Sequence, residues 1–414
     1  MGTNEQEEEA MKSLVKRFQW VSVVSLLLVL SMLIIPFSSA FAAEKGPKIT
    51  VMTRNLYLGA DIFKVVEAAQ ENPDDPLAVP IAVAEVYNTM LYTNFWARAE
   101  AIADEIAENK PDVVGLQEVS TFYKQTPGDF LNGNPEQASF VVIDFYKALE
   151  AALRDRDMEY EKFEVTNADV ELPMLDFKSE TLLSDVRMVD HDMVLVRKGH
   201  AAATLIAGNY SQNLGLTLGG RYVEFTRGFL IVDVNVKAEA FRFVNTHLEV
   251  RSEPGSVFRV IQSAQMMELL YTLNSLDAKP VVMVGDFNSS PEDVPGTGYL
   301  PSGAPVDYVP PYMQAIEGGY LDAWLLQNGY DEGYTSGFGE YISNPFDELT
   351  TRIDLILTDP CGLSIDRVKC DVVGDEISDM VPNPLLPRVL RLWPSDHAGV
   401  VGKIKFNNLV KSRF

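Results

Sequence analysis

The sequence predicts an α/β fold. Its two clearest strands, residues 112–119 and 281–286, are apolar runs rich in valine that end in polar residues. This pattern is typical of buried strands that deliver their last residues to the edge of a sheet. Before the first of them, residues 96–109 carry apolar side chains at helical spacing and stop before Pro111. The chain has 414 residues, of which 47% are hydrophobic, and this is enough apolar material for a large core.

The N-terminal part shows the same alternation of strand and helix. Residues 47–58 begin with a strand, and because side chains alternate along a strand, four of them share one face: Ile49, Val51, Thr53 and Asn55. Residues 59–95 predict helical pieces around a loop at residues 72–76. A connection of this length often shapes a binding site.

The rest of the chain gives a coarser assignment. Further strands are expected at residues 190–197, 228–236, 241–250, 352–358 and 399–406. Helices are expected at residues 141–153 and 256–276, with a helical piece near residues 320–327 inside a long Gly/Pro/Tyr-rich segment, residues 289–350. Residues 120–139 are expected to form a loop, and residues 155–187 give no clear assignment.

Residues 1–42 have the features of a secretory signal. A basic segment after Met11 precedes an apolar run, residues 20–37, and the sequence Ala40-Phe41-Ala42 predicts cleavage after Ala42. We therefore expect the protein to be secreted or extracytoplasmic. The alternative is an uncleaved N-terminal membrane anchor, for which the apolar run is slightly short.

The charge of the chain limits its partners. Residues 1–42 carry four acidic and three basic side chains, so the chain without them has a net charge of −24. An acidic surface repels polyanions, and binding to nucleic acid or to anionic lipid would need a local basic patch or bridging cations. This charge argues against a tight DNA-binding protein but is compatible with a metal-dependent enzyme that acts on phosphates.

The chain contains two cysteines, Cys361 and Cys370. An exported protein can form a short-range disulfide, and the eight residues between them are compatible with a turn followed by a strand. We therefore expect the two cysteines to pair. A metal site is not expected here, because no histidine or further cysteine lies nearby.

Polar side chains that can bind metals or move protons stand at the predicted strand ends. They are Asn55, Glu118, His247, Asp286, Asn288, Asp354, Asp396 and His397. Two of the four histidines of the chain belong to this set. The other two have weaker claims, because His191 is flanked by two acids and His200 lies in an expected turn.

Six short motifs carry a resemblance to a known family. In chain order they are RNLY, GLQEV, NTHL, GDFN, RIDLIL and SDH, and the resemblance that they carry runs from about residue 48 to residue 405. The series resembles the endonuclease/exonuclease/phosphatase superfamily, which includes deoxyribonucleases and neutral sphingomyelinases. The resemblance implies a four-layer sandwich of two packed mixed β-sheets flanked by helices. It also implies one domain, residues 43–414, with insertions near residues 57–95 and 289–350.

The resemblance also implies roles for the strand-end residues. Glu118 resembles the main Mg²⁺ ligand, with Asn55 and Asp396 as supporting groups, and Mn²⁺ or Ca²⁺ are alternative ions. The remaining five residues resemble the catalytic set: His247, Asp286, Asn288, Asp354 and His397. In this set Asp286 and Asn288 orient or deprotonate the attacking water and contact the phosphate.

The two histidines are each expected to have an acidic partner. By the resemblance, Asp354 accepts the ring N–H of His397. The nearest candidate for His247 is residues 190–197, where Asp190 and Asp192 share a face. Asp190 is the preferred partner, and the alternative is that both acids are surface charges.

These observations predict a secreted, metal-dependent hydrolase of a phosphodiester, in either a lipid head group or a nucleic acid. The chain departs from the sphingomyelinase motif at residues 57–60, so the head group stays open. Two alternatives are a phosphomonoesterase of the inositol-phosphatase kind and a non-catalytic secreted binding protein. We expect a phosphate-ester substrate, no stable protein partner and a monomer.

Overall fold

The computed structural model describes residues 48–218, 220–237, 239–329, 331–361, 364–385 and 390–407. The chain divides into two units, residues 1–46 and residues 47–414, and the description below concerns the second. The predicted signal or anchor at residues 1–42 lies outside the described residues. Across the described ranges, no helix is both long enough and apolar enough to cross a membrane.

The first sheet is mixed and has eight strands. Its order is β17 (Ser364–Val373), β20 (Gly399–Asn407), β1 (Lys48–Asn55), β2 (Val113–Gln117), β6 (Leu183–Arg197), β3 (Thr121–Gln125) and β4 (Phe140–Asp144), and β5 (Tyr160–Leu175) also pairs with β6. Only β1 and β2 pair in parallel, with Asn55 opposite Gln117. The carboxyl ends of these two central strands therefore meet at the same edge.

The second sheet is also mixed and has six strands. Its order is β15 (Leu321–Asp322), β16 (Asp354–Asp359), β12 (Val281–Asp286), β11 (Glu239–His247), β10 (Gly228–Val236) and β7 (Ala201–Asn209). Strands β11 and β12 are parallel, with His247 opposite Asp286. Strand β16 runs antiparallel to β12, and this places Asp354 opposite Asp286.

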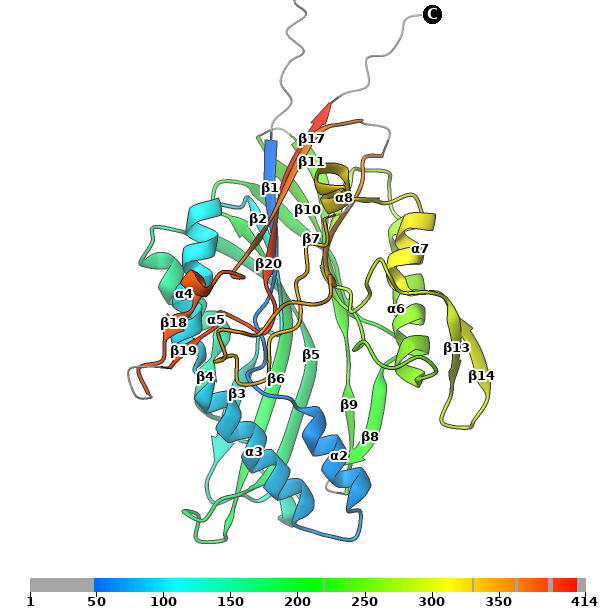
Figure 1. The fold of residues 1–414 in the computed structure, drawn as a ribbon. Coiled ribbons are helices and arrows are strands. Elements are labelled where there is room, and N and C mark those ends of the chain that lie inside the picture. The colour runs from blue at the N-terminus through cyan, green and yellow to red at the C-terminus, as the bar shows by residue number, and fades with distance from the viewer. Residues whose placement is uncertain are drawn as a thin grey trace, which may run out of the picture. The chain divides into compact units, whose positions relative to one another are not determined.

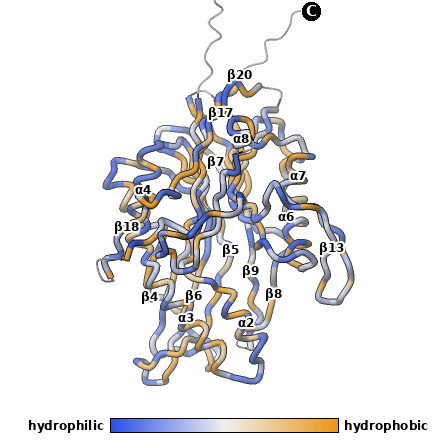
Figure 2. The backbone as a smooth tube through the Cα atoms, viewed as in Figure 1, coloured by the Kyte–Doolittle hydropathy of each residue, from blue (hydrophilic) through white to orange (hydrophobic). Residues whose placement is uncertain are grey.

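The two sheets pack face to face through one apolar layer. Alternate side chains of both sheets form it, among them Val51 and Val194 from the first sheet and Val232, Phe243 and Val284 from the second. Figure 2 shows hydrophobic stretches that run along the strands, with hydrophilic stretches in many connecting loops. The face of β1 predicted from alternation is confirmed, because Ile49 and Val51 lie in this layer.

Helices cover the outer face of each sheet. The first sheet packs under α3 (Ala78–Tyr92), α4 (Phe95–Asn109) and α5 (Phe145–Arg154), with α2 (Phe63–Glu71) beside α3. The second sheet packs under α6 (Val257–Asn274) and α7 (Pro311–Glu317). Figure 1 shows α4 and α5 on one side of the sheets and α6 and α7 on the other. The predicted α/β sandwich of two packed mixed sheets between helices is confirmed.

Smaller elements complete the described residues. Three two-stranded sheets join β8 (Leu214–Leu218) to β9 (Arg221–Phe225), β13 (Gly296–Tyr299) to β14 (Pro305–Tyr308), and β18 (Val381–Pro382) to β19 (Arg391–Leu392). The expected helical piece near residues 320–327 is α8 (Ala323–Asn328), which the Asp322 carboxylate caps by accepting from the Trp324 N–H at 2.9 Å.

Two expectations for the middle of the chain were wrong in part, and a segment without an assignment forms a hairpin. Residues 141–153 begin as strand β4, and helix α5 starts only after Asp144, whose carboxylate accepts from the Lys147 N–H. The expected loop at residues 120–139 contains strand β3, which pairs with both β4 and β6. The unassigned residues 155–187 form most of the long β5–β6 hairpin. In each case pairing with neighbours distant in the chain overrides the local pattern.

The expected disulfide is also wrong, because Cys361 and Cys370 are free in the structure. Cys370 is buried on β17 and packs in the layer between the sheets. Cys361 lies in the turn after β16, where its backbone N–H donates to the Asp359 carboxylate at 2.8 Å. Because side chains alternate along a strand, the Cys370 thiol points into the core.

Candidate active site

The structure brings all eight strand-end residues together at one end of the two sheets. Asn55, His247 and Asp286 are the last residues of β1, β11 and β12, and Asp354 is the first residue of the antiparallel β16. The remaining four lie in the turns next to these strand ends: Glu118, Asn288, Asp396 and His397. Each sheet therefore supplies part of the site.

Asn55 connects the two sheets through its carboxamide. Its Nδ2 donates to Glu118 Oε1 at 3.1 Å and to Asp286 Oδ2 at 3.2 Å. Its Oδ1 accepts from the Tyr57 N–H at 2.9 Å, and this bond fixes the orientation of the amide. Asn55 thus holds the Glu118 and Asp286 carboxylates close to each other, in addition to its predicted place near a metal.

Glu118 is positioned by the backbone as well as by Asn55. Its φ angle is +59°, in the left-handed region, so the chain turns sharply directly after β2. Its Oε2 accepts from the Leu58 N–H at 2.6 Å. This turn aims the carboxylate back over the strand ends, where it remains partly exposed to solvent.

His397 and Asp354 form a close acid–histidine pair, as expected. His397 Nδ1 lies 2.8 Å from Asp354 Oδ2, and both residues are buried. The Ser395 hydroxyl accepts from the His397 N–H at 3.2 Å and donates to the Asn55 carbonyl at 2.9 Å. The histidine is therefore held through its backbone as well as through its ring.

His247 has different neighbours from those expected. An Arg227 Nη1 lies 3.1 Å from both ring nitrogens, and Asn288 Nδ2 lies 3.4 Å from Nε2. The carboxylate that lies close enough to His247 for an ion pair is that of Asp286, whose Oδ2 is 3.6 Å from His247 Nε2.

The expectation that Asp190 or Asp192 orients His247 was wrong. Both acids are buried and point between the sheets, but Asp190 accepts from the Ser120 hydroxyl at 2.8 Å and from Asn167 Nδ2 at 3.3 Å. Asp192 has no hydrogen-bond partner among the described residues. The alternative of two surface charges is wrong as well, because both side chains are buried.

Burial and neighbouring acids raise the pKa of two carboxyl groups of the site. Burial and the nearby Asp396 raise the pKa of Glu118 to about 7. Burial and Asp354 raise the pKa of Asp286 to about 7. Several acidic groups are thus crowded into a region where their charges are poorly solvated.

The two histidines have opposite electrostatic environments. Burial, then Arg227 and His397, lower the pKa of His247 well below its usual value. Burial also acts to lower the pKa of His397, but the carboxylates of Asp354, Asp396 and Asp286 outweigh it and raise that pKa well above its usual value. The surroundings of His247 therefore favour its neutral ring, and those of His397 favour its charged form.

The donor set fits a divalent cation. The closest group of metal-competent atoms in the described residues belongs to Asp286, Asp354 and His397, which offer atoms within 4.8 Å of one another. Asp354 Oδ1 is buried and has no hydrogen-bond partner. Hard oxygen donors and uncompensated negative charge are what Mg²⁺ and similar ions bind. A cation beside these carboxylates would hold them in their ionised form, and a protonated His397 would not be among its ligands.

Sequence reasoning missed the importance of Arg227. Its guanidinium contacts His247 and lies 3.6 Å from Glu249 Oε1. Arg227 lies directly before the buried strand β10. This position was the available signal, because β11, β12 and β16 of the same sheet also have site residues at a strand end.

A comparison with known protein families gives one match. Residues 92–397 match the model of the Endonuclease/Exonuclease/phosphatase family. No curated protein sequence matches the chain.

Several solved structures are similar in fold. A family protein from Bacteroides thetaiotaomicron has a TM-score of 0.49 and 14% identity, over 87% of this chain and 99% of its own. A mannosyl-6-phosphatase from the same organism has a TM-score of 0.48 and 15% identity, over 86% and 99%. TDP2 from Caenorhabditis elegans has a TM-score of 0.45 and 15% identity, over 90% and 78%. At these levels the substrates of those proteins do not transfer to this chain.

Proposed function

The chain belongs to the Endonuclease/Exonuclease/phosphatase family, and from this premise we propose that it is an exported, Mg²⁺-dependent phosphodiesterase. Members of this family are metal-dependent phosphoesterases, nucleases and phosphatases, and the chain is a metal-dependent phosphoric ester hydrolase. The diester substrate, the identity of the ion and export from the cell are the proposed parts.

One observation carries the proposal of phosphate-ester hydrolysis: two histidines flank one carboxylate, and their surroundings shift the two ring pKa values in opposite directions. The Nε2 atoms of His247 and His397 lie 3.6 Å and 4.0 Å from the same Asp286 oxygen. A charged imidazole can serve as a proton donor to a phosphate, and a neutral imidazole on the other side can serve as its hydrogen-bonding partner. The leaving oxygen of a phosphate ester departs as an alkoxide, so hydrolysis is helped by a group that donates a proton to it.

The residues can then be given roles in hydrolysis. Asp286 accepts a proton from the attacking water, and Asn288 and Asn55 hold Asp286 in place. His397, charged and oriented by Asp354, donates a proton to the leaving oxygen as its bond to phosphorus breaks. Glu118, with Asn55 and Asp396, would hold the divalent ion, which would supply Lewis-acid polarisation of a phosphoryl oxygen.

A phosphomonoester substrate is less favoured by the charges of the site. A monoester dianion calls for several cationic side chains, and two of the nearest arginines are engaged elsewhere. The Arg98 guanidinium donates to backbone carbonyls such as those of Leu56 and Thr93, and Arg54 pairs with Glu105. Within the described ranges, Arg227 is the arginine that contacts the ring of a site histidine, whereas Arg54 donates to the backbone carbonyl of His397.

The proposal is tested with two chromogenic substrates. Bis-p-nitrophenyl phosphate should be hydrolysed faster than p-nitrophenyl phosphate in the presence of Mg²⁺, and EDTA should abolish both activities. His247→Ala should lower diester hydrolysis by about 10²-fold. His200→Ala, at a histidine near β7 outside the site, should leave the rate unchanged. Faster hydrolysis of the monoester would favour a phosphomonoesterase instead.

Export and a monomeric state are part of the proposal. The supporting observation is the basic and apolar pattern of residues 1–42. Expression in a secreting host should release a protein that begins at Ala43, as read by N-terminal sequencing, and light scattering should give the mass of one chain. A cell-bound protein that retains residues 1–42 would point to a membrane anchor.

A further inference from the structure

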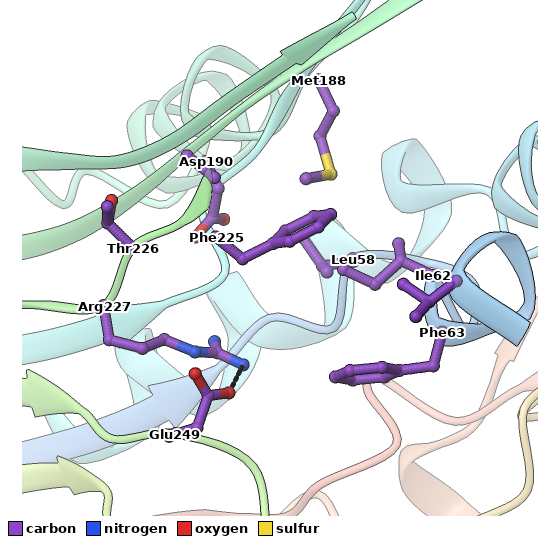
Figure 3. A pocket seen from close by; sticks show the side chains of 11 residues that line it. Leu58, Ile62, Phe63, Met188, Asp190, Phe225, Thr226, Arg227 and Glu249 are labelled. Atoms are coloured by element: carbon purple, nitrogen blue, oxygen red, sulfur yellow. Dashed lines mark ion pairs between the residues drawn. The ribbon is translucent and has the colours of Figure 1, made fainter. Parts of the chain in front are cut away.

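An apolar pocket opens directly beside the site, under helix α2. Its apolar wall is formed mainly by Leu58, Ile62, Phe63, Ala168, Met188 and Phe225. Figure 3 shows Arg227 and its ion pair with Glu249 on one side of this space, with Leu58, Ile62 and Phe63 on the other. Resting on the proposed diesterase activity, we propose that this pocket binds an apolar substituent of the phosphate ester, such as a short alkyl chain.

The pocket is joined to the reacting groups at its mouth. Arg227 lines the pocket and also contacts His247 at 3.1 Å. Leu58 lines it too, and its backbone N–H holds the Glu118 carboxylate at 2.6 Å. A phosphate placed between Glu118 and His247 therefore has the pocket next to it, and a substituent on that phosphate can enter.

A second apolar cavity adjoins the first one, and we infer that a chain can pass from one into the other. The two share Ile62, Met188 and Phe225, and the second extends between α2 and α3 towards Val86 and Leu172. Their volumes are about 30 Å³ and about 60 Å³. Because one water needs roughly 10–15 Å³ on this measure, the passage holds a few carbon atoms in a row rather than a nucleoside or a sugar.

The polar groups at the mouth are engaged in part, since Arg227 Nε and Glu249 Oε2 are buried without a hydrogen-bond partner. Asp190 accepts from Ser120 and Asn167, and Arg227 faces Glu249. Beyond the mouth, the second cavity is lined by apolar side chains, apart from the hydroxyl group of Tyr87. Burial of methylene groups against such a wall is favourable, whereas burial of a hydroxyl or a charged group there is unfavourable because it finds no hydrogen-bond partner.

A series of alkyl p-nitrophenyl phosphates tests the inference in the presence of Mg²⁺. From methyl to butyl, kcat/KM should rise about threefold to fourfold with each methylene, the factor that corresponds to burying one CH₂. A longer chain should give no further gain once the passage is full.

Two variants narrow the pocket and should remove this chain-length dependence. Ala168→Leu places a larger side chain in the wall, and Ile62→Trp does so at the less buried start of α2. Both should lower kcat/KM for the butyl ester tenfold or more and leave the methyl ester unchanged. Ala201→Leu, at an exposed position on β7, is the matched control and should behave like the wild type.

The outcomes separate the inference from the function on which it rests. Equal kcat/KM for all chain lengths, with the methyl ester hydrolysed, would overturn the inference and leave the diesterase activity in place. Retained dependence on chain length in both folded variants would also overturn it. Hydrolysis of none of the esters would overturn the proposed diesterase activity and the inference together.

Discussion

At the scale of single residues, the site is organised by contrasts between neighbouring groups. His397 is paired with Asp354 at 2.8 Å, whereas His247 faces the guanidinium of Arg227 at 3.1 Å. The same ring therefore has a raised pKa at one position and a lowered pKa at the other. Environments that push two titratable groups apart are how an enzyme assigns separate proton-transfer roles.

The acid–histidine pair should act as one unit. We expect His397→Ala and Asp354→Asn each to lower kcat by about 10²-fold or more, and the double variant to be little worse than either. The physical reason is that Asp354 works only through the ring that it orients. Steady-state kinetics of the three variants measures this, and rate losses that multiply in full would show that the residues act independently.

Metal binding should depend on pH near neutrality. Glu118 and Asp286 have pKa values raised to about 7, so below pH 7 they must lose protons before they can face a cation. We expect the Kd for Mg²⁺ to fall tenfold or more between pH 6 and pH 8, with release of protons on binding. Calorimetry in buffers of different ionisation enthalpy measures both quantities, and a pH-independent Kd without proton release would contradict the assignment.

At the scale of elements, local pattern predicted the buried strands well and the paired edge strands badly. The apolar runs of β2 and β12 are buried on both faces, so their sequences identify them without knowledge of their neighbours. Strands β3 and β4 and the β5–β6 hairpin are defined by pairing with segments far along the chain, which no short window of sequence contains.

The same division holds for the candidate site. Glu118, Asp286 and His397 could be predicted because motifs of known order mark the strand ends. The partner of His247 could not, because it depends on which of several nearby side chains reaches the ring in three dimensions. Asp190 lies on the expected face of β6, but its two carboxylate oxygens accept hydrogen bonds from Ser120 and Asn167.

Helix α4 should depend on one buried arginine. Arg98 is fully buried and donates to the backbone carbonyls of Thr93, Leu56, Tyr57 and Pro394. Since an unsatisfied buried acceptor costs about 1–3 kcal/mol, Arg98→Leu should lower the free energy of unfolding by about 3 kcal/mol or more.

Urea denaturation measures this effect. The control is Arg154, which is exposed and lies on α5 rather than on α4. Arg154 forms an ion pair with Glu150 one turn away on α5. Its replacement by Leu should change the free energy of unfolding by less than about 0.5 kcal/mol. Equal stability of the Arg98 and Arg154 variants would show that α4 is held by apolar packing alone.

At the scale of the whole molecule, the site exists only where the two sheets meet. Asn55 and Glu118 come from the first sheet, and His247, Asp286 and Asp354 come from the second. Below them, Gln117 Nε2 donates to Asn245 Oδ1 at 2.7 Å across the layer between the sheets. The spacing of the sheets therefore sets the spacing of the site residues.

Gly115 on β2 allows this close approach of the sheets. A Cβ atom there would lie 2.6 Å from both Asn245 Oδ1 and Val284 Cγ2. We expect Gly115→Ala to lower the free energy of unfolding by about 1–3 kcal/mol and to reduce activity as well, since overpacking moves the sheets apart. Gly208→Ala on β7 is the matched control, because a Cβ there meets nothing within 4 Å. Activity and stability equal to the control would contradict this role of Gly115.

The most direct test of the central claim is the Mg²⁺ dependence of bis-p-nitrophenyl phosphate hydrolysis by the wild type and Glu118→Gln. Glu67→Gln, at an exposed acid on α2, is the control. We expect the Glu118 variant to lose activity by orders of magnitude and to require far more Mg²⁺, with an unchanged circular dichroism spectrum, while the control matches the wild type. A Glu118 variant as active as the wild type at low Mg²⁺ would contradict the metal-dependent site.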